Sequence, residues 1–188
     1  MKSALPGLPF TIHHSPFTLR PVPISELLLP EYDSEITITR KVLERVPDDR
    51  GEWKPHEKAF KMGHLAQLVA RLPEWVVMTL EKTELDIAPK DGPRTAGYTV
   101  EPTATLLALF DKNAKAGRAA LAKATDADFQ VPWTLKAGGN AVLTQPRYMI
   151  VRQMVLNHLV HHRAQLGIYL RLVDQKVPQM YGPTADER

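Results

Sequence analysis

Apolar residues recur at three- and four-residue steps in four long stretches of this chain, which are separated by segments rich in proline, glycine and polar residues. Such spacing puts apolar side chains on one face of an α-helix. The predicted helices cover about residues 30–46, 60–82, 102–124 and 146–174. Pro73 lies inside the second and is expected to kink or interrupt it. Four amphipathic helices with unequal connections predict an all-α protein, a four-helix bundle.

The segments outside these helices are few. Residues 1–29 are rich in proline, which removes backbone donors and prevents a continuous helix. We expect an extended arm there, lying on the domain or on a partner subunit, followed by one domain over residues 30–188. Residues 86–101 are predicted to form a loop, and the connection 126–144 is predicted to hold a hairpin or a short extended piece.

The composition limits the possible chemistry of the protein more than it limits the possible folds. Because the chain has no cysteine, disulfides, thiolate ligands and a cysteine nucleophile are excluded, and a metal site would use histidine, carboxylates or water. The net charge is only +3, and the basic residues are interleaved with acidic ones, which argues against nucleic-acid binding. No apolar run approaches the roughly 18 residues of a membrane span. The N-terminus has no apolar signal core, so we expect a cytoplasmic protein.

Two histidines, His158 and His162, are four residues apart on the apolar stripe of the last predicted helix. That spacing puts both imidazoles on one helix face, where they could ligate one divalent metal ion. It also fits a hydrogen-bonded pair in the core, because buried ring nitrogens need partners. His161 lies on another face and is expected to be exposed or paired with a carboxylate. For Arg163 and Gln165 the simplest roles are surface charge and amide packing.

The residues around this pair resemble a known family. The sequence LNHLVHHRAQLGIYLRL at 156–172, followed by VP at 177–178 and YGPTADE at 181–187, closely resembles the C-terminal signature of DinB-like proteins. Earlier stretches agree, namely LERVP at 43–47, WKPH at 53–56, LA at 65–66, LPEW at 72–75 and PW at 132–133. The resemblance covers nearly the whole chain from about residue 30 to the end.

The resemblance implies an up-down-down-up four-helix bundle that commonly forms a homodimer. It also implies a divalent metal ion, often nickel or zinc, held by three histidines, of which two match His158 and His162 by motif. The third normally comes from the second helix, and alignment of that segment on residues 65–70 puts Leu68 at its position. His64 stands one turn earlier and is a possible substitute.

The expected metal ligands are therefore His64, His158 and His162. Gln67 or His56 could reach the site instead. The remaining alternative is a two-ligand or vacant site, in which the helix-borne pair belongs to a hydrogen-bonded core.

The resemblance also implies an activity, because relatives are regarded as metal-dependent hydrolases or as metal-dependent transferases of low-molecular-weight thiols. A divalent ion with open positions can lower the pKa of bound water or thiol and act as a Lewis acid. We therefore expect a metal-dependent enzyme acting on a small molecule at the mouth of the bundle. No general base is evident, since the second helix offers only Glu74, near its kink. The alternative is a non-catalytic, stress-related binding bundle with a degenerate metal site, and the polar tail 181–187 is expected to dock on the bundle.

Overall fold

The structure is a computed structural model that describes residues 21–91 and 97–187. Its helices are α1 (Ile24–Leu43), η1 (Asp48–Arg50), α2 (Met62–Arg71), α3 (Glu74–Glu81), α4 (Thr103–Lys123), α5 (Asp126–Gln130), α6 (Arg147–Ile150), η2 (Val151–Asn157) and α7 (His158–Leu172). Its strands are β1 (Glu84–Asp86), β2 (Pro132–Ala137) and β3 (Asn140–Pro146). No helix within these ranges is both long enough and apolar enough to cross a lipid bilayer.

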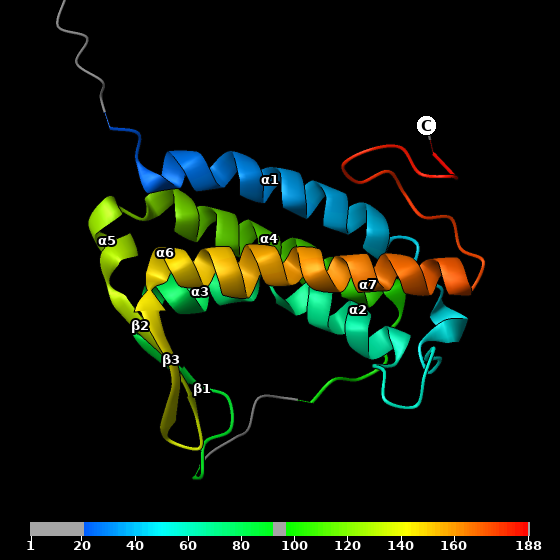
Figure 1. Cartoon of the computed structure of the whole chain (residues 1–188), viewed down its shortest axis with the longest axis horizontal. Coiled ribbons are helices and arrows are strands. Elements are labelled where there is room, and N and C mark those ends of the chain that lie inside the picture. Colours follow the sequence, from blue (N-terminus) through cyan, green and yellow to red (C-terminus); the bar gives the residue numbers. More distant parts are fainter. Residues whose placement is uncertain (1–20, 92–96, 188) are drawn as a thin grey trace, which may run out of the picture.

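The long helices lie side by side, with the small sheet at one end of them (Figure 1). α1 and α2 each contact both α4 and α7, while α3 follows α2 along the same line and contacts α4. α6, η2 and α7 form one continuous rod in which the middle segment is π-helical. The protein is therefore mostly helical, and its apolar core lies between these rods.

α1 begins earlier than predicted. Its first residue is Ile24, whose backbone N–H donates to Asp126 Oδ1 at 2.8 Å, whereas the predicted helix began at residue 30. Pro30 lies inside α1 on its exposed side and does not end the helix. Residues 24–29, predicted as part of an extended arm, are thus helical, and residues 1–20 of that arm lie outside the described residues.

The other three predicted helices are present. The interruption expected at Pro73 is confirmed, because α2 ends at Arg71 and α3 begins at Glu74. α4 and the rod from α6 to α7 begin and end close to the predicted positions. The π-helical turn of η2 was not predicted, because it adds one residue to a turn without changing the local composition.

The prediction of an all-α protein is confirmed only in part, because the mostly helical chain also has a small three-stranded sheet in the order β1-β2-β3. β2 and β3 form the predicted hairpin, turning at Gly138 and Gly139, which have φ of 61° and 83°. Such left-handed conformations suit glycine because it has no Cβ. β1 pairs in parallel with β2, so that Leu85 lies opposite Leu135, and the sheet packs on the helices through the buried Trp133.

One close helix contact explains a glycine in the middle of α4. The Tyr32 hydroxyl donates to the carbonyl of Ala114 at 3.0 Å. A Cβ on Gly117 would lie 2.5 Å from that hydroxyl oxygen and 2.9 Å from the carbonyl oxygen of Pro73. α4 can therefore approach both α1 and the junction between α2 and α3 only because residue 117 has no side chain.

Candidate functional site

The first turn of α7 brings His158 and His162 together. Their Nε2 atoms are 2.8 Å apart, and their ring centroids are 4.5 Å apart. His162 is only 7% exposed and His158 is partly buried. The four-residue spacing therefore produces the convergence expected from the sequence, with both imidazoles facing the inside of the molecule.

The second ring nitrogen of His162 is also occupied. Its Nδ1 lies 2.8 Å from Oε1 of Gln165, whose Nε2 lies 3.1 Å from Nε2 of the exposed His161. With Nδ1–H donating to the amide oxygen, Nε2 of His162 carries a lone pair and points it at His158. Gln165 thus orients His162, a role more specific than the amide packing expected from the sequence.

Both imidazoles are poor bases in this setting. Burial lowers the pKa of His158, and the nearby charge of His162 lowers it further, although a backbone hydrogen bond with Met154 partly opposes this. Burial likewise lowers the pKa of His162, while its hydrogen bond with Gln165 raises it. The two rings are therefore neutral at pH 7, the protonation state that metal ligation needs.

His64 of α2 lies near this pair but is engaged elsewhere. Its ring packs against Phe60, with centroids 4.5 Å apart, and stacks on Tyr98 at 4.1 Å. Burial lowers the pKa of His64, and the charge of His162 lowers it further, which reflects their proximity. Across residues 21–91 and 97–187, no three side chains of His, Cys, Asp or Glu come close enough together to hold a metal ion.

Leu68, which the sequence alignment puts at the position of the family's third histidine, lies near His158. It lines a cavity of about 130 Å³ together with five other side chains, those of Arg71, Leu72, Trp75, Tyr98 and His158. The other candidate ligands of this region are bonded elsewhere. Gln67 exchanges hydrogen bonds with Thr99, and His56 Nδ1 accepts from the backbone N–H of Lys58.

The His158–His162 pair has the dimensions of half a metal site. Two nitrogens bound at about 2.1 Å would lie about 3.0 Å apart at the right angles of an octahedral site and about 3.4 Å apart in a tetrahedral one. The observed 2.8 Å is near the first value and is also the length of a hydrogen bond between the rings. The hydrogen bond from His162 to Gln165 is of the type that fixes the tautomer of a metal-bound imidazole. The donor pair therefore fits a divalent ion, whereas the third ligand is not assembled with it.

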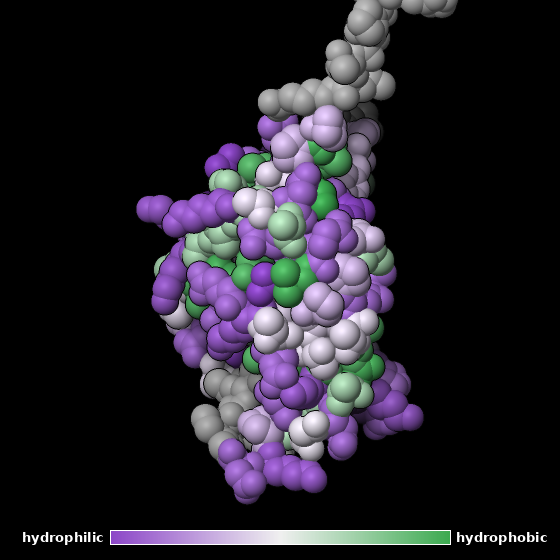
Figure 2. Space-filling view, turned by 90° about the vertical axis from the view of Figure 1, so that its left-hand side faces the viewer, coloured by the Kyte–Doolittle hydropathy of each residue, from purple (hydrophilic) through white to green (hydrophobic). Residues whose placement is uncertain are grey.

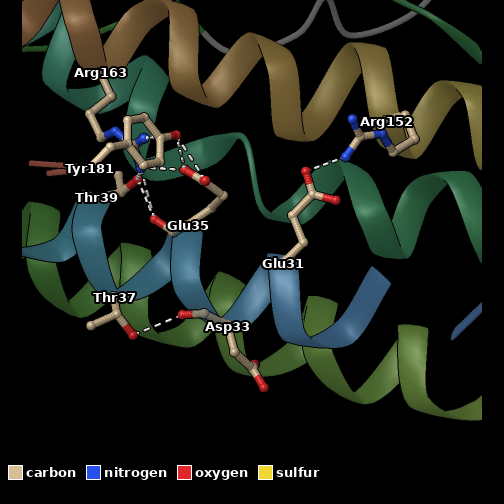
Figure 3. Close-up of polar contacts among 8 residues, drawn as sticks. All are labelled: Glu31, Asp33, Glu35, Thr37, Thr39, Arg152, Arg163 and Tyr181. Atoms are coloured by element: carbon tan, nitrogen blue, oxygen red, sulfur yellow. Dashed lines mark hydrogen bonds and ion pairs between the residues drawn. The ribbon is translucent and has the colours of Figure 1, made fainter. Parts of the chain in front are cut away.

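Arg163, the next residue of α7, belongs to a buried polar network that the sequence analysis missed (Figure 3). Its side chain is 1% exposed, and its Nη1 lies 2.7 Å from a carboxylate oxygen of Glu35 and 3.0 Å from Thr39 Oγ1. Its Nη2 donates at 2.5 Å to the hydroxyl of Tyr181, which donates in turn to Glu35 at 2.8 Å. The surface role expected for Arg163 is wrong, because its α1 and tail partners are distant in the sequence.

The C-terminal tail docks on the helices, as predicted. Asp186 pairs with Arg171 at 2.5 Å and accepts from the backbone N–H of Val177 at 2.9 Å. Glu187 pairs with Arg45 at 2.9 Å. These contacts hold the tail in the position from which the Tyr181 hydroxyl reaches the buried network.

A larger cavity, of about 570 Å³, lies away from the histidines where α1, α5, α6 and η2 meet. It is lined by Ile24, Leu27, Leu28, Glu31, Gln130, Tyr148 and Arg152. Figure 2 shows this end of the molecule, where apolar patches lie among polar side chains. The charged groups of the cavity, Glu31 and Arg152, form an ion pair with each other (Figure 3). None of the predicted site residues lies there.

Comparison with solved structures identifies the fold. A DinB-like protein from Bacillus cereus ATCC 10987 superposes with a TM-score of 0.64 at 17% sequence identity, over 85% of this chain and 98% of that one. A DinB-like protein from Bacillus subtilis gives a TM-score of 0.61 at 14% identity, over 83% of this chain and 99% of that one. No protein-family model and no curated protein matches the sequence.

Sequence and structure thus point to the same relatives. The superposition covers almost the full length of both neighbours. This chain also has the helical rods, the histidine pair at the start of α7 and the docked tail that its sequence predicted. At these identities the likeness concerns the fold. The resemblance inferred from the sequence is confirmed at that level: this chain has the fold of the DinB-like proteins.

Proposed function

We propose that this protein is a metal-dependent enzyme acting on a small molecule, either as a hydrolase or as a transferase of a low-molecular-weight thiol. Its divalent cation, nickel or zinc, is held by His158 and His162, with His64 as the third ligand. One observation carries the proposal. The Nε2 atoms of the pair face each other at 2.8 Å while Nδ1 of His162 is bonded to Gln165.

That arrangement favours a cation for an electrostatic reason. When the amide oxygen of Gln165 accepts from Nδ1–H, the neutral His162 ring directs an unshared electron pair at the other imidazole. A positive charge between the two rings then satisfies both nitrogens. Since burial already keeps both rings neutral, no proton must be displaced before a cation binds.

A bound divalent ion supplies a Lewis acid and lowers the pKa of a coordinated water or thiol. The chain's own residues position what is bound. Gln165 fixes the orientation of His162, and the cavity next to His158 has partly apolar walls. Leu68 and Trp75 form part of those walls and would contact an apolar portion of the substrate.

A second candidate function is a non-catalytic binding bundle whose metal site is degenerate. Two observations favour it. Leu68 lines the cavity at the position of the family's third histidine, and His64 is stacked between Phe60 and Tyr98. In that case the side-chain amide of Gln165 has the opposite orientation, and its Nε2 donates to Nδ1 of His162. The hydrogen bond between the Nε2 atoms of His162 and His158 is then a permanent part of the core.

Elemental analysis of protein purified without an affinity tag separates the two candidates. The enzyme proposal expects about one divalent ion per chain. It also expects that His158→Ala and His162→Ala each remove the ion, whereas the matched control His161→Ala, a change in the exposed neighbour, retains it. His64→Ala tests the third ligand, and Leu68→His should raise occupancy if that ligand is missing.

The opposite result is equally clear. Protein that contains no metal, and whose thermal stability responds neither to chelator nor to added zinc or nickel, overturns the enzyme proposal and supports the degenerate bundle. If Leu68→His alone creates a site, His64 does not act as a ligand in the natural chain.

We further propose that the helical rods form an up-down-down-up four-helix bundle, in which α2 and α3 together count as the second helix. We also propose that the chain forms a homodimer. Ile168 and Leu172 are exposed apolar side chains on α7 and support a contact on that face. Light scattering after size exclusion tests the dimer, and Ile168→Lys should convert it to a monomer if this face is used.

A further inference from the structure

His64 lies in an aromatic sandwich that holds its ring away from the His158–His162 pair. Phe60 packs on one side, tilted by 35°, and Tyr98 stacks on the imidazole with an interplanar angle of 22°. Phe60 also lies 6.2 Å from the ring of His162, centroid to centroid. His64 is thus beside the pair but is held by ring contacts.

The segment that carries Tyr98 is fastened to α2 by its next residue. The backbone N–H of Thr99 donates to Oε1 of Gln67 at 2.9 Å, and Nε2 of Gln67 donates to the Thr99 hydroxyl at 3.0 Å. Gln67 is itself buried. One α2 side chain therefore fixes both the backbone and the side chain of the residue that follows Tyr98.

Val100 provides a second attachment, in a slot formed by two glycines. A Cβ added to Gly51 would lie 2.1 Å from Cγ1 of Val100, and one added to Gly63 would lie 3.0 Å from Cγ2. Glycine at both positions therefore leaves the space that the valine fills. Together with the Gln67–Thr99 pair, this slot fixes the place where Tyr98 emerges.

Tyr98 links His64 to the cavity beside the pair. Its ring lies under the guanidinium of Arg71 at 5.4 Å and lines the cavity that contains His158, whereas His64 does not line that cavity. The aromatic ring thus contacts both the His64 imidazole and the space beside His158. Removal of the ring opens that space and releases the imidazole from its stack at the same time.

We propose that Tyr98 is a positioning residue that controls whether His64 joins His158 and His162 as a metal ligand. While Tyr98 is stacked, the pair offers two nitrogens. When Tyr98 leaves, His64 becomes available as the third. This inference rests on the proposed metal site and adds a device that sets its affinity for the cation.

The test is a double-mutant cycle on zinc affinity, measured by calorimetry on protein without an affinity tag. Tyr98→Ala should tighten zinc binding by roughly 2- to 12-fold, the strength of one aromatic stack. The matched control Tyr98→Phe keeps the ring and should leave the affinity unchanged. In the His64→Ala background, Tyr98→Ala should have no effect.

Three outcomes overturn the inference. If Tyr98→Ala leaves zinc affinity unchanged or weakens it, the stack does not restrain a ligand. If it tightens binding equally in the His64→Ala background, the ring only blocks access to the pair. If zinc binds to none of these proteins, the proposed metal site fails and this inference fails with it, a result distinct from the first two.

A second variant guards against a local effect of the alanine. Val100→Ala weakens the attachment in the glycine slot without changing Tyr98, and it should tighten zinc binding in the same direction by a smaller factor. The ring proton shifts of His64 in the NMR spectrum report the stack directly. They should move in Tyr98→Ala and Val100→Ala but not in Tyr98→Phe, and a spectrum unchanged in Tyr98→Ala also overturns the inference.

Discussion

Two adjacent residues of α7, His162 and Arg163, enter two polar clusters of opposite character. Arg163 is enclosed by Glu35, Thr39 and Tyr181, which come from α1 and the tail. His162 meets the imidazole of His158, with their Nε2 atoms 2.8 Å apart. The first, closed cluster balances its charges within the chain, although Nε of Arg163 has no hydrogen-bond partner among the described residues, whereas the second, open cluster is the proposed place of a cation. The difference teaches that burial alone does not mark a functional group, because Arg163 is balanced by a carboxylate of the same chain, whereas the two imidazoles contact only each other and a neutral amide through the nitrogens of His162.

Breaking the closed cluster should have the largest effect on stability. Arg163→Met leaves the buried Glu35 carboxylate without its cationic partner, and we expect a loss of about 3–5 kcal/mol in the free energy of unfolding. Urea denaturation followed by circular dichroism measures it. The double variant Glu35→Gln, Arg163→Met removes both charges and should recover part of the loss. A loss below about 1 kcal/mol in Arg163→Met would show that the pair is solvated in solution.

Filling the open cluster should have the next largest effect. Zinc at 100 times its dissociation constant should stabilise the folded protein by about 2.7 kcal/mol, observed as a rise in thermal midpoint. Chelator should reverse the rise. His162→Ala should abolish it, and His161→Ala, the matched change in the exposed neighbour, should keep it. An equal rise in His162→Ala would mean that zinc binds elsewhere.

A milder change to the closed cluster concerns the tail. Tyr181 is 67% exposed, yet its hydroxyl contacts both Arg163 and Glu35. Tyr181→Phe keeps the ring over the guanidinium and removes these hydrogen bonds, so we expect a loss of about 1.5 kcal/mol in the free energy of unfolding. Limited proteolysis should then cut the tail faster. A wild-type rate of cleavage would show that Asp186 and Glu187 hold the tail without the tyrosine.

The pH dependence should give the smallest effect and sharpens the contrast. Burial lowers the pKa of His158 and His162 below the ordinary value of 6.5. Above pH 6.5 the rings are neutral in both folded and unfolded chains, so their contribution is fully present. As the pH falls from 6.5 through the lowered pKa values, the unfolded chain takes up protons first and the metal-free protein loses stability. The variant His158→Asn, His162→Gln should reduce this loss in pH-dependent thermal unfolding, and His64, whose pKa is also lowered by burial, should supply part of the remainder. A slope unchanged in the double variant would assign the loss to other groups.

The sequence predicts the helices well because each carries a local apolar period. It predicts the histidine pair for the same reason, since His158 and His162 are related by one helical turn. The start of α1 was misplaced because Pro30 resembled a first helical residue, and its position inside the helix depends on tertiary packing. β1 was missed because it has three residues and pairs with β2, which lies far along the chain.

The missed parts of the site share a physical cause. Glu35 and Tyr181 meet Arg163 across long sequence separations, so no local pattern reports the network. The available signal was a glutamate three residues after Tyr32, on the face of α1 that turned out to be buried. Tyr98 was read only as part of a loop, because the slot that fixes its segment is formed by the backbones of two distant glycines.

The π-helical segment η2 sets the rotation of α7 relative to α6 about the axis of their common rod. Each residue of an α-helix advances the side-chain direction by about 100°. η2 contains one residue more than regular α-helical winding would need at that point. Deleting one residue from Val151–Asn157 would restore regular winding and keep the direction of the two histidines. If all seven residues instead wound as a regular α-helix, His158 and His162 would be rotated by roughly 100° relative to the part of the rod that packs on Trp133. Both histidines would remain in the sequence, and the site would still be dismantled by a change of register.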